Sequence, residues 1–579
     1  MHLRAIPVLL LWSVLGLWAA VHASCRDPAD PLEPVKPTLP GKPCTAFTLA
    51  EWTSQERWVW KQVCEGQFAD FNKAEGNKIR LDPKKPDGWE EKRVLRQFFL
   101  ETILLYEPWR GMVPRQGVRI SGAWFKEPLN LSNAEIKHAL VLHCSRFDAY
   151  VILLGLRTTR FLLFDDSAFK AHLNMSGIRV EDALLMRDAQ FTSVRLRGAH
   201  IGNQLSLTNT MVTGWLEMDS LEVGRSLMME RAQFTNVSLF GTHINGQLSL
   251  INTTVTGILE MSALSTESSL LMLTRKEYFT DKRAHFADVH LSGVHIGGHL
   301  ILSGTPVTGT LKINSSEVEG RLDLSDALLP SLDLTGSRIG ELRLARKSLV
   351  TRWRPKATLT LWSVTAGAIQ DAHNAWPDTL ELNGFTYGRW VGFTGGETHD
   401  VMHQRDVGWF IEWLSKQAEY SPQPYEYLAK VLYEEGHKAA AREILYAGKE
   451  RERSKACRSK NPRQPDACDL SELPWLWLSI LKVFIGYGYY VGFTFRWAIG
   501  ATIIGMGVLK ISGQGQKHKM KYCGLAYSID MLLPIVELRR YHFDKIDLEG
   551  WARVYFYCHK VFGYVLALFL AAGLTGLVK

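Results

Sequence analysis

The stretch VRLRGAHIGNQLSL, residues 194–207, decides the fold because it recurs along the chain. A second copy, VSLFGTHINGQLSL, occupies residues 237–250 and begins 43 residues later; a third begins as VHLSGVHI at 289–296, a further 52 residues on. The longer interval predicts an insertion near residues 274–283. Each copy continues with Val-Thr-Gly-x-Leu, at 212–216, 255–259 and 307–311. A fixed period of this length is the signature of a repeat architecture.

Within a copy, apolar residues recur about every five positions, as at Phe234, Leu239 and Ile244. This spacing fits neither a helix nor a long alternating strand. It predicts very short strands joined by tight turns, where Gly and Asn supply a permissive backbone. A coil would have roughly 21 residues, half of the 43-residue period, and would bury its inward side chains only by stacking on its neighbours.

The pattern extends over residues 117–390. We therefore predict a mainly β chain built on a right-handed β-solenoid of about 13 coils, on the order of 60 Å long at ~4.8 Å per step. The competing interpretation is a β-sandwich of many short strands. A sandwich leaves the 43-residue repeat unexplained.

The N-terminal region reads as an export signal followed by a linker. Residues 1–23 have a basic start, an apolar stretch and small residues before a predicted cleavage after Ala23. An uncleaved anchor helix is the alternative. Residues 24–44 form a Pro-rich linker. Residues 45–116 are predicted to be a helical cap on the solenoid, with helices at 48–75 and 88–106.

The C-terminal region is predicted to be helical and attached to a membrane. Residues 391–455 contain a helix at 403–417 and a helical hairpin at 422–453, broken at Gly436. A basic linker, 456–474, precedes a membrane domain at 475–579. That domain starts with an amphipathic helix at 475–486. Membrane spans are predicted at 493–509 and 561–578, with an interrupted apolar segment at 522–538 between them.

The net charge of the 579-residue chain is +8, and the basic residues concentrate near the predicted spans. Anionic lipid explains this charge better than nucleic acid does, so no nucleic-acid partner is expected. The signal sequence indicates a bacterial inner-membrane protein with its solenoid in the periplasm. The seven Lys and Arg residues in 449–463 disagree with that orientation, because basic flanks prefer the cytoplasmic side.

Six of the eight cysteines precede the membrane region, which permits disulfides in an exported protein. Cys457 and Cys468, eleven residues apart in a polar stretch, are the first predicted pair. Cys25 and Cys44 are the next candidate pair. Cys558 and Cys523 are expected to be free.

His399 and His403 are four residues apart, so a helix would place both imidazoles on one face, with Asp406 as a third metal ligand. The alternative is a surface capping turn. His200, His243 and His295 recur in the repeats and either form a stacked ladder or are simply solvent-facing. Two consecutive carboxylates, Asp165 and Asp166, are similar to acidic clusters of polysaccharide enzymes, but turn carboxylates are common. No Gly-rich nucleotide motif follows a predicted strand, and no cofactor is predicted.

Four further stretches carry a resemblance: GVRISGA at 117–123, YSPQPYEYL at 420–428, LLPIVEL at 532–538 and AGLTGL at 572–577. With the five-residue rhythm, they resemble a group of bacterial membrane-anchored proteins with pentapeptide-repeat-like, right-handed β-helices, sometimes labelled membrane-associated oxidoreductases. The resemblance implies architecture more than activity, because the group supplies no catalytic residues to carry over.

Three functions remain open. Repeats without a catalytic constellation favour a non-enzymatic scaffold whose solenoid binds a protein or an envelope polymer, anchored by the lipid bilayer. A pore or conductance regulator is the second, with Asp530 and Glu537 in its pore segment; it lacks a Gly-Tyr-Gly filter. An envelope enzyme using the histidine pair is the third.

Overall fold

The computed structural model describes residues 44–73, 81–275, 284–346, 348–394, 397–400, 405–456, 473–490, 492–520, 524–533 and 546–575. The predicted signal peptide and nearly all of the Pro-rich linker lie outside these residues. The chain forms two compact units. The first consists of Met1–Asp378 with Trp390–His399, and the second of Thr379–Arg389 with Asp400–Lys579.

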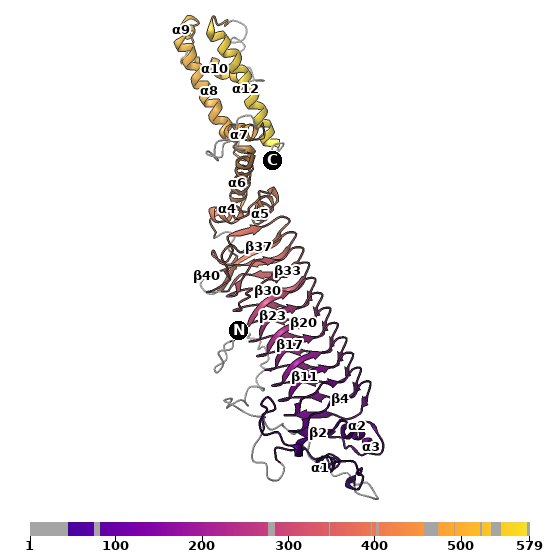
Figure 1. The fold of residues 1–579 in the computed structure, drawn as a ribbon. Helices are drawn as coiled ribbons and strands as arrows, with labels where there is room; N and C mark the ends of the chain where they lie inside the picture. Colours follow the sequence, from indigo (N-terminus) through magenta and orange to yellow (C-terminus); the bar gives the residue numbers. More distant parts are fainter. Residues whose placement is uncertain are drawn as a thin grey trace, which may run out of the picture. The chain divides into compact units, whose positions relative to one another are not determined.

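The first unit is a parallel β-solenoid of about 12 turns, which confirms the predicted fold class (Figure 1). Its short strands pair with the same position one coil away, as Leu162 does with Leu184 and Leu184 with Leu205. Parallel pairing satisfies the backbone of every coil through its neighbours, which is why strands of two residues are stable here.

The strands fall into two long parallel sheets. In the first unit, one sheet contains β1 (Ala69–Asp70), β2 (Val118–Ser121), β5 (Glu135–Ile136), β6 (Leu140–His143), β9 (Arg157–Thr158), β10 (Leu162–Leu163), β12 (Arg179–Val180), β13 (Leu184–Leu185), β15 (His200–Ile201), β16 (Leu205–Ser206), β18 (Glu222–Val223), β19 (Leu227–Met228), β21 (His243–Ile244), β22 (Leu248–Ser249), β24 (Ser265–Thr266), β25 (Leu270–Leu271), β27 (His295–Ile296), β28 (Leu300–Ile301), β30 (Glu317–Asp323), β33 (Arg338–Arg343) and β38 (Thr365–Gln370). The other contains β3 (Trp124–Phe125), β4 (Leu129–Asn130), β7 (Arg146–Phe147), β8 (Val151–Ile152), β11 (Ala168–Asn174), β14 (Gln190–Arg195), β17 (Met211–Glu217), β20 (Gln233–Ser238), β23 (Thr254–Glu260), β26 (His285–His290), β29 (Leu311–Lys312), β32 (Leu332–Asp333) and β37 (Thr358–Thr360).

Each coil points four aligned side chains into the core, and this explains the five-residue rhythm. In one coil these are Met186, Phe191, Leu196 and Ile201, which are five residues apart and all at most 1% exposed. Full burial of such side chains stabilises the fold by about 1.5–3 kcal/mol each. Aromatic rings stack in one column: the Phe147 and Phe169 centroids are 4.2 Å apart with planes 7° from parallel.

Corners with a left-handed backbone recur at half-coil intervals. Positive φ angles occur at steps of ten or eleven residues, at Asn133, Cys144, Gly155, Asp166, Gly177, Asp188, Gly198 and Asn209. Two such corners per coil return the chain to its starting column. Gly, Asn and Asp tolerate this conformation best, so the corner residues of the repeats are explained by local geometry.

Two insertions interrupt the regular coils without breaking the columns. Leu270 pairs with Leu300, a step of 30 residues, so the predicted insertion lies between β25 and β26. A second occurs where β34 (Ala345–Arg346) and β35 (Leu349–Val350) form an antiparallel hairpin, followed by β36 (Arg352–Trp353), which pairs with β31 (Leu328–Leu329). Insertions at corners leave the inward residues in register.

The N-terminal cap is helical as predicted, but its helices are shorter. η1 (Cys44–Ala46) precedes α1 (Ser54–Cys64), and η2 (Glu91–Arg93) precedes α2 (Gln97–Leu105) and α3 (Trp109–Met112). The prediction of a helix over 48–75 is wrong after Cys64, because β1 instead pairs with β2 of the first coil. The helix predicted from residue 88 begins only at Gln97, since Leu95 bonds to Trp124 as an extended residue.

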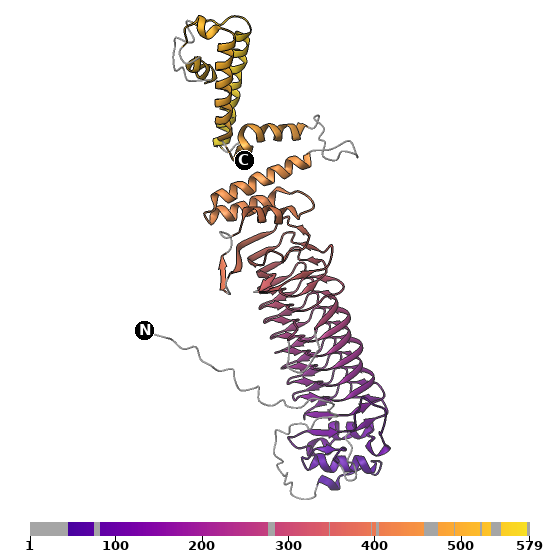
Figure 2. The same cartoon turned by 90° about the vertical axis from the view of Figure 1, so that its left-hand side faces the viewer.

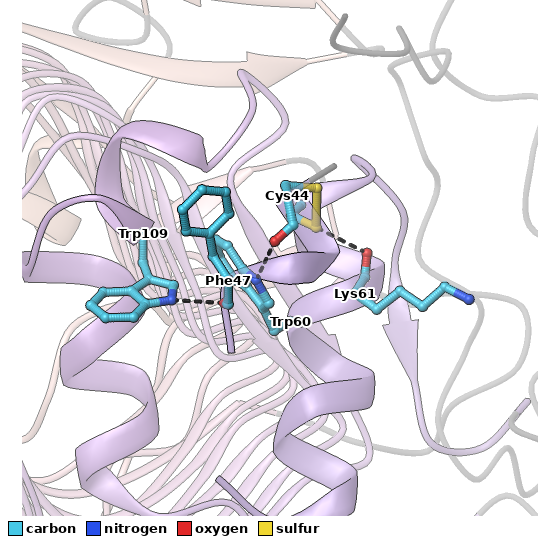
Figure 3. The surroundings of a disulfide bond; sticks show 6 residues. Cys44, Phe47, Trp60, Lys61 and Trp109 are labelled. Atoms are coloured by element: carbon cyan, nitrogen blue, oxygen red, sulfur yellow. Dashed lines mark hydrogen bonds between the residues drawn. A yellow bond between two sulfur atoms is a disulfide. The ribbon is translucent and has the colours of Figure 1, made fainter. Parts of the chain in front are cut away.

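A disulfide joins Cys44 to Cys64, with Cα atoms 6.0 Å apart (Figure 3). The predicted pairing of Cys44 with Cys25 is therefore wrong. The indole of Trp60 donates to the Cys44 carbonyl at 3.1 Å, and that of Trp109 donates to the Phe47 carbonyl at 2.9 Å. The disulfide and both indoles hold the start of the cap against its helices.

The second unit contains the helical hairpin and two long apolar helices. α4 (Val407–Ser415) and α5 (Pro422–Glu434) fall within the predicted ranges, whereas α6 (Lys438–Ala456) extends past the predicted end at 453; Gly436 takes φ +91° between α5 and α6. They are followed by α7 (Leu473–Ile485), η3 (Gly486–Gly488), α8 (Gly492–Ile511), α9 (Gln514–Lys517), α10 (Leu525–Leu532) and α12 (Trp551–Thr575). Strand β39 (Thr379–Glu381) bonds to this unit through Leu380, whose N–H donates to the Lys416 carbonyl. Among the described residues, the last strands are β40 (Thr386–Thr394) and β41 (Glu397–Asp400).

Two helices among the described residues are long and apolar enough to cross a membrane: α8 over Gly492–Ile511, and α12 over Trp551–Ala571 (Figure 2). Large apolar side chains point outward from both, including Ile503, Ile511 and Leu568, which are 62%, 80% and 70% exposed. Such exposure is unfavourable in water. The second span was predicted at 561–578, but its helix begins earlier, at Trp551, and includes Arg553 and Lys560.

Candidate functional site

Four neighbouring strands of the second sheet form an outward surface, here called the Thr–Gly face. It consists of the outward residues of β14, β17, β20 and β23. Their inward neighbours, such as Val212 and Val255, are buried in the core. The outward side chains are Gln190, Thr192, Ser193, Met211, Thr213, Trp215, Gln233, Thr235, Asn236, Thr254, Thr256 and Ile258.

A β-bulge in alternate coils shapes this face. Between Val212 and Leu216 the chain has one more residue than between Phe234 and Val237, and the pairing register shifts there. The extra position is the Gly of the Val-Thr-Gly-x-Leu motif. A Cβ on Gly257 would clash with Asn236 Oδ1 and lie 2.8 Å from the Thr235 carbonyl oxygen, so only glycine fits.

The bulge also explains the length of the repeat. Along one column, Arg179 to His200 is a step of 21 residues and His200 to Glu222 a step of 22, and the same alternation continues through His243. The 43-residue repeat is therefore one plain coil and one bulged coil.

The Thr–Gly face offers hydrogen-bonding groups without charge. Thr235 donates its hydroxyl to the Thr213 carbonyl at 2.9 Å, and Asn236 Oδ1 accepts the Ile258 N–H at 3.0 Å. These bonds fix the side chains in place, so they present an ordered array one strand step apart, ~4.8 Å. Trp215 is 43% exposed within this array, and an exposed indole is a stacking platform with a polar edge.

Charged residues of these strands lie only at their C-terminal ends. Glu217 there forms ion pairs with Arg195 at 3.2 Å and with Arg197 at 3.0 Å, and Glu260 pairs with His290 at 3.1 Å. Opposite charges on successive coils neutralise one another along this edge. The surface between the edges is therefore neutral.

A second polar cluster lies buried at the start of the solenoid. Ser121 Oγ is 3.1 Å from His143 Nδ1, and His143 Nε2 is 3.4 Å from Asp166 Oδ2. These residue types act together in nucleophilic catalysis. Here, however, Ser121 is 2% exposed and His143 4% exposed, so no substrate reaches the serine in this structure. The cluster instead ties three successive coils together.

Asp165, next to this cluster, belongs to an ion pair with the following coil. Arg187 donates to its carboxylate from Nε at 2.8 Å and from the backbone N–H at 2.7 Å. Burial raises the pKa of the Asp165 carboxyl, and the bonds from Arg187 only partly oppose that effect. The two carboxylates singled out in the sequence therefore have separate structural partners.

No family model, no curated protein and no solved structure matches this chain. The residues and their geometry are therefore the basis for function.

His200, His243 and His295 lie in one outward column but do not stack on one another. The coil between each pair places a different residue there: His200 Nδ1 is 2.9 Å from Glu222, and His243 Nδ1 is 2.5 Å from Ser265. The ladder interpretation is wrong because the 43-residue period spans two coils. The solvent-facing interpretation is confirmed for His200, whose side chain is 43% exposed.

The predicted metal ligands are only partly within the described residues. The prediction places His399 and His403 on one helical turn. His399 lies in strand β41 instead, so no helix begins at this residue. His403 lies outside the described residues. Asp406 is the N-cap residue of α4. The described residues contain no group of three His, Cys, Asp or Glu side chains arranged to hold a metal ion.

The predicted Cys457–Cys468 disulfide also lies outside the described residues. Within them, Cys144 is disulfide-bonded, as are Cys44 and Cys64, whereas Cys558 is free and exposed. Paired cysteines persist in oxidising compartments.

The interrupted segment between the spans forms the short helix α10, packed between α8 and α12. Ser528 Oγ donates to the Thr502 carbonyl at 3.1 Å, and His559 Nε2 is 3.1 Å from the Ser528 carbonyl oxygen. A Cβ on Gly563 would clash with the Leu532 carbonyl. Asp530 is fully buried here, and Glu537 lies outside the described residues. α10 has 8 residues, fewer than a helix needs to span a bilayer.

The Thr–Gly face was not recognised from sequence, although its signal was present. The repeated Val-Thr-Gly-x-Leu motif marks the bulge, and the Thr and Asn residues around it are uncharged. The linear pattern does not show which residues of successive coils share one outward surface. The Ser121–His143–Asp166 cluster has a weaker signal, a spacing of about one coil between its members.

Proposed function

We propose that the protein is a membrane-anchored, non-enzymatic scaffold whose solenoid binds an extended neutral glycan of the bacterial envelope. The Thr–Gly face would hold the polymer along successive coils. α8 and α12 would anchor the protein in the inner membrane, with the solenoid in the periplasm.

The observation that carries this proposal is the neutrality of the Thr–Gly face combined with its exposed indole. Hydroxyl and amide groups such as those of Thr213 and Asn236 match the neutral hydroxyls of a sugar chain, and Trp215 can stack on a sugar ring. A polyanion would require a basic surface instead. The regular step between coils suits a polymer with a repeating unit.

The paired cysteines support the location. The Cys44–Cys64 disulfide holds the N-terminal cap, and such bonds are rare in the reducing cytosol. This agrees with the predicted signal sequence. The resemblance to bacterial membrane-anchored β-helix proteins fits the same proposal, because short strands with inward residues about every five positions are common to both.

Trp215→Ala tests the function. We expect the purified full chain to bind a soluble neutral polysaccharide and not polyanionic alginate in affinity electrophoresis. The Trp215→Ala variant should lose at least about fivefold in affinity, since stacking on an exposed aromatic ring contributes ~1 kcal/mol or more.

Phe240→Ala is the matched control, because Phe240 is an exposed aromatic residue at a corner and outside the strands of the face. Equal loss in both variants, or binding to alginate alone, contradicts the proposal. Capture of a protein in place of glycan, abolished by Trp215→Ala, would identify the face but overturn the ligand class.

A further inference from the structure

A cavity of about 610 Å³ opens on the helical hairpin of the second unit, between α5 and α6. Its volume is in the range of small-molecule sites, ~300–1,000 Å³. Apolar residues form much of its lining: Ala429 from α5, Ala441 and Leu445 from α6, and Tyr489 from the segment before α8. An apolar cavity of this size favours a ligand with a hydrocarbon part.

Three cations also line the cavity: Lys430, Lys438 and Arg442. Lys430 is 3.9 Å from Glu434, and the Lys438 ammonium lies 5.3 Å from the centre of the Tyr433 ring. Among the described residues, no carboxylate lies within ion-pairing distance of Lys438 or Arg442. Glu426 is the one acidic side chain in the lining, so the net charge of the lining is positive and favours an anion.

The cavity adjoins the membrane helices within the same unit. Leu445 and Tyr489 also contact the apolar cluster formed by Leu478, Leu481 and Ile485 of α7. α8 begins at Gly492, three residues after Tyr489. An amphiphile with its acyl chains in the bilayer could therefore reach the cavity with its headgroup.

Charged groups fix the contact between α6 and α7. Glu450 accepts from Lys482 Nζ at 2.8 Å, from the Tyr487 hydroxyl at 2.5 Å and from Arg453 at 3.2 Å. This network holds the hairpin on the helix that leads into the membrane. The position of the cavity relative to α8 is thus set by the fold.

We infer that this cavity is a binding site for an anionic phospholipid of the surrounding bilayer. Lys438 and Arg442 bind the headgroup phosphates, and Leu445 and Tyr489 contact the adjoining acyl chain. The inference requires the membrane attachment of the protein but not the glycan-binding function, because the site is on the helices of the second unit.

The test measures the lipid retained by the full chain in native mass spectrometry after exposure to phosphatidylglycerol in detergent. We expect one phosphatidylglycerol per chain. Replacing both cations in Lys438→Gln/Arg442→Gln should weaken retention roughly thirtyfold, because each basic residue near an anionic headgroup strengthens binding by slightly more than about fivefold and the two factors multiply.

Lys455→Gln is the matched control, since Lys455 is an exposed cation of the same helix that does not line the cavity. Unchanged retention in Lys438→Gln/Arg442→Gln overturns the inference. Equal retention of phosphatidylcholine, oleate or inorganic phosphate also overturns it, because each would show that an anionic phospholipid is not what the site selects. If thermal unfolding of the double variant shows a folding defect, the single variants Lys438→Gln and Arg442→Gln replace it. Retention equal to that of the native chain in both single variants overturns the inference as well.

Discussion

Hydroxyl groups buried in the solenoid are satisfied by the backbone of the preceding coil. Thr210 Oγ1 donates to the Met186 carbonyl at 2.7 Å, and Ser167 Oγ donates to the Leu142 carbonyl at 2.9 Å. A buried hydroxyl without a partner would cost ~1–3 kcal/mol. These residues therefore replace aliphatic side chains at corners without loss of stability. The sequence repeat is less regular at these positions, although the coil is unchanged.

Glu56 is a buried ionised residue of the N-terminal cap. Its carboxylate accepts from Arg96 Nη2 at 2.6 Å and from the Thr53 N–H at 2.8 Å. Burial by itself raises the pKa of Glu56, but the bonds from Arg96 and Thr53 outweigh it, and the pKa is lowered below 4.5.

Glu56→Gln should change how stability depends on pH. Because the folded pKa of Glu56 is below its unfolded value, its ionised form stabilises the cap above pH 4.5, and this contribution is lost as pH falls through the folded pKa. Urea unfolding of the variant should therefore show a weaker loss of stability below pH 4.5 than the native chain. Glu51→Gln, an exposed neighbour, should leave the pH profile unchanged. Parallel profiles for the native chain and Glu56→Gln would refute this assignment.

Bulged strands alternate with plain strands, and the alternation depends on glycine at one position. Gly214, Gly257 and Gly309 occupy that position in the three repeats. A Cβ added to any of them would lie within 3.0 Å of a carbonyl oxygen of the preceding coil. A side chain there would force adjacent coils apart and break the column register. The bulge is therefore the most sequence-sensitive part of the strand.

Gly257→Ala should destabilise the solenoid by about 1–3 kcal/mol, as overpacking a closely packed site does. Thermal unfolding followed by circular dichroism would detect it as a lower melting temperature. Thr256→Ala is the control, since its side chain is exposed one residue earlier on the same strand. An unchanged melting temperature for Gly257→Ala would show that the bulge tolerates a methyl group.

Stacking makes the solenoid a sum of similar units. Each coil pairs with its two neighbours in both sheets, so no contact depends on a distant coil. The natural unit of length is the 43-residue pair of coils, because a bulged coil must be followed by a plain one to restore the register.

Deleting residues 212–254, one complete pair of coils, should leave a folded protein with the same β-sheet signal per residue. Met211 would then precede Val255, which stands at the position that Val212 had. Deleting residues 212–222, half a coil, should abolish cooperative unfolding because it stacks two-residue strands of one sheet on the long strands of the other. Circular dichroism and limited proteolysis distinguish the two variants. Equal stability of both deletions would show that coil register does not matter.

The sequence by itself determined the solenoid, the two apolar C-terminal helices and the helical hairpin broken at Gly436. All three depend on local patterns: the spacing of inward residues, the length of an apolar run, and a turn residue between amphipathic segments. It also located the insertion between β25 and β26, since an interval between repeats measures length directly.

Only the tertiary structure decided which residues meet. Because the 43-residue period contains two coils, the histidines that recur in sequence are separated in space. Stacking of successive coils, in contrast, brings Ser121, His143 and Asp166 together. The Cys44–Cys64 pair, the neutral Thr–Gly face and the cavity between α5 and α6 are likewise products of packing. A repeat fixes what lies inward within each coil, but contacts between coils and between helices depend on register, which one chain read linearly does not contain.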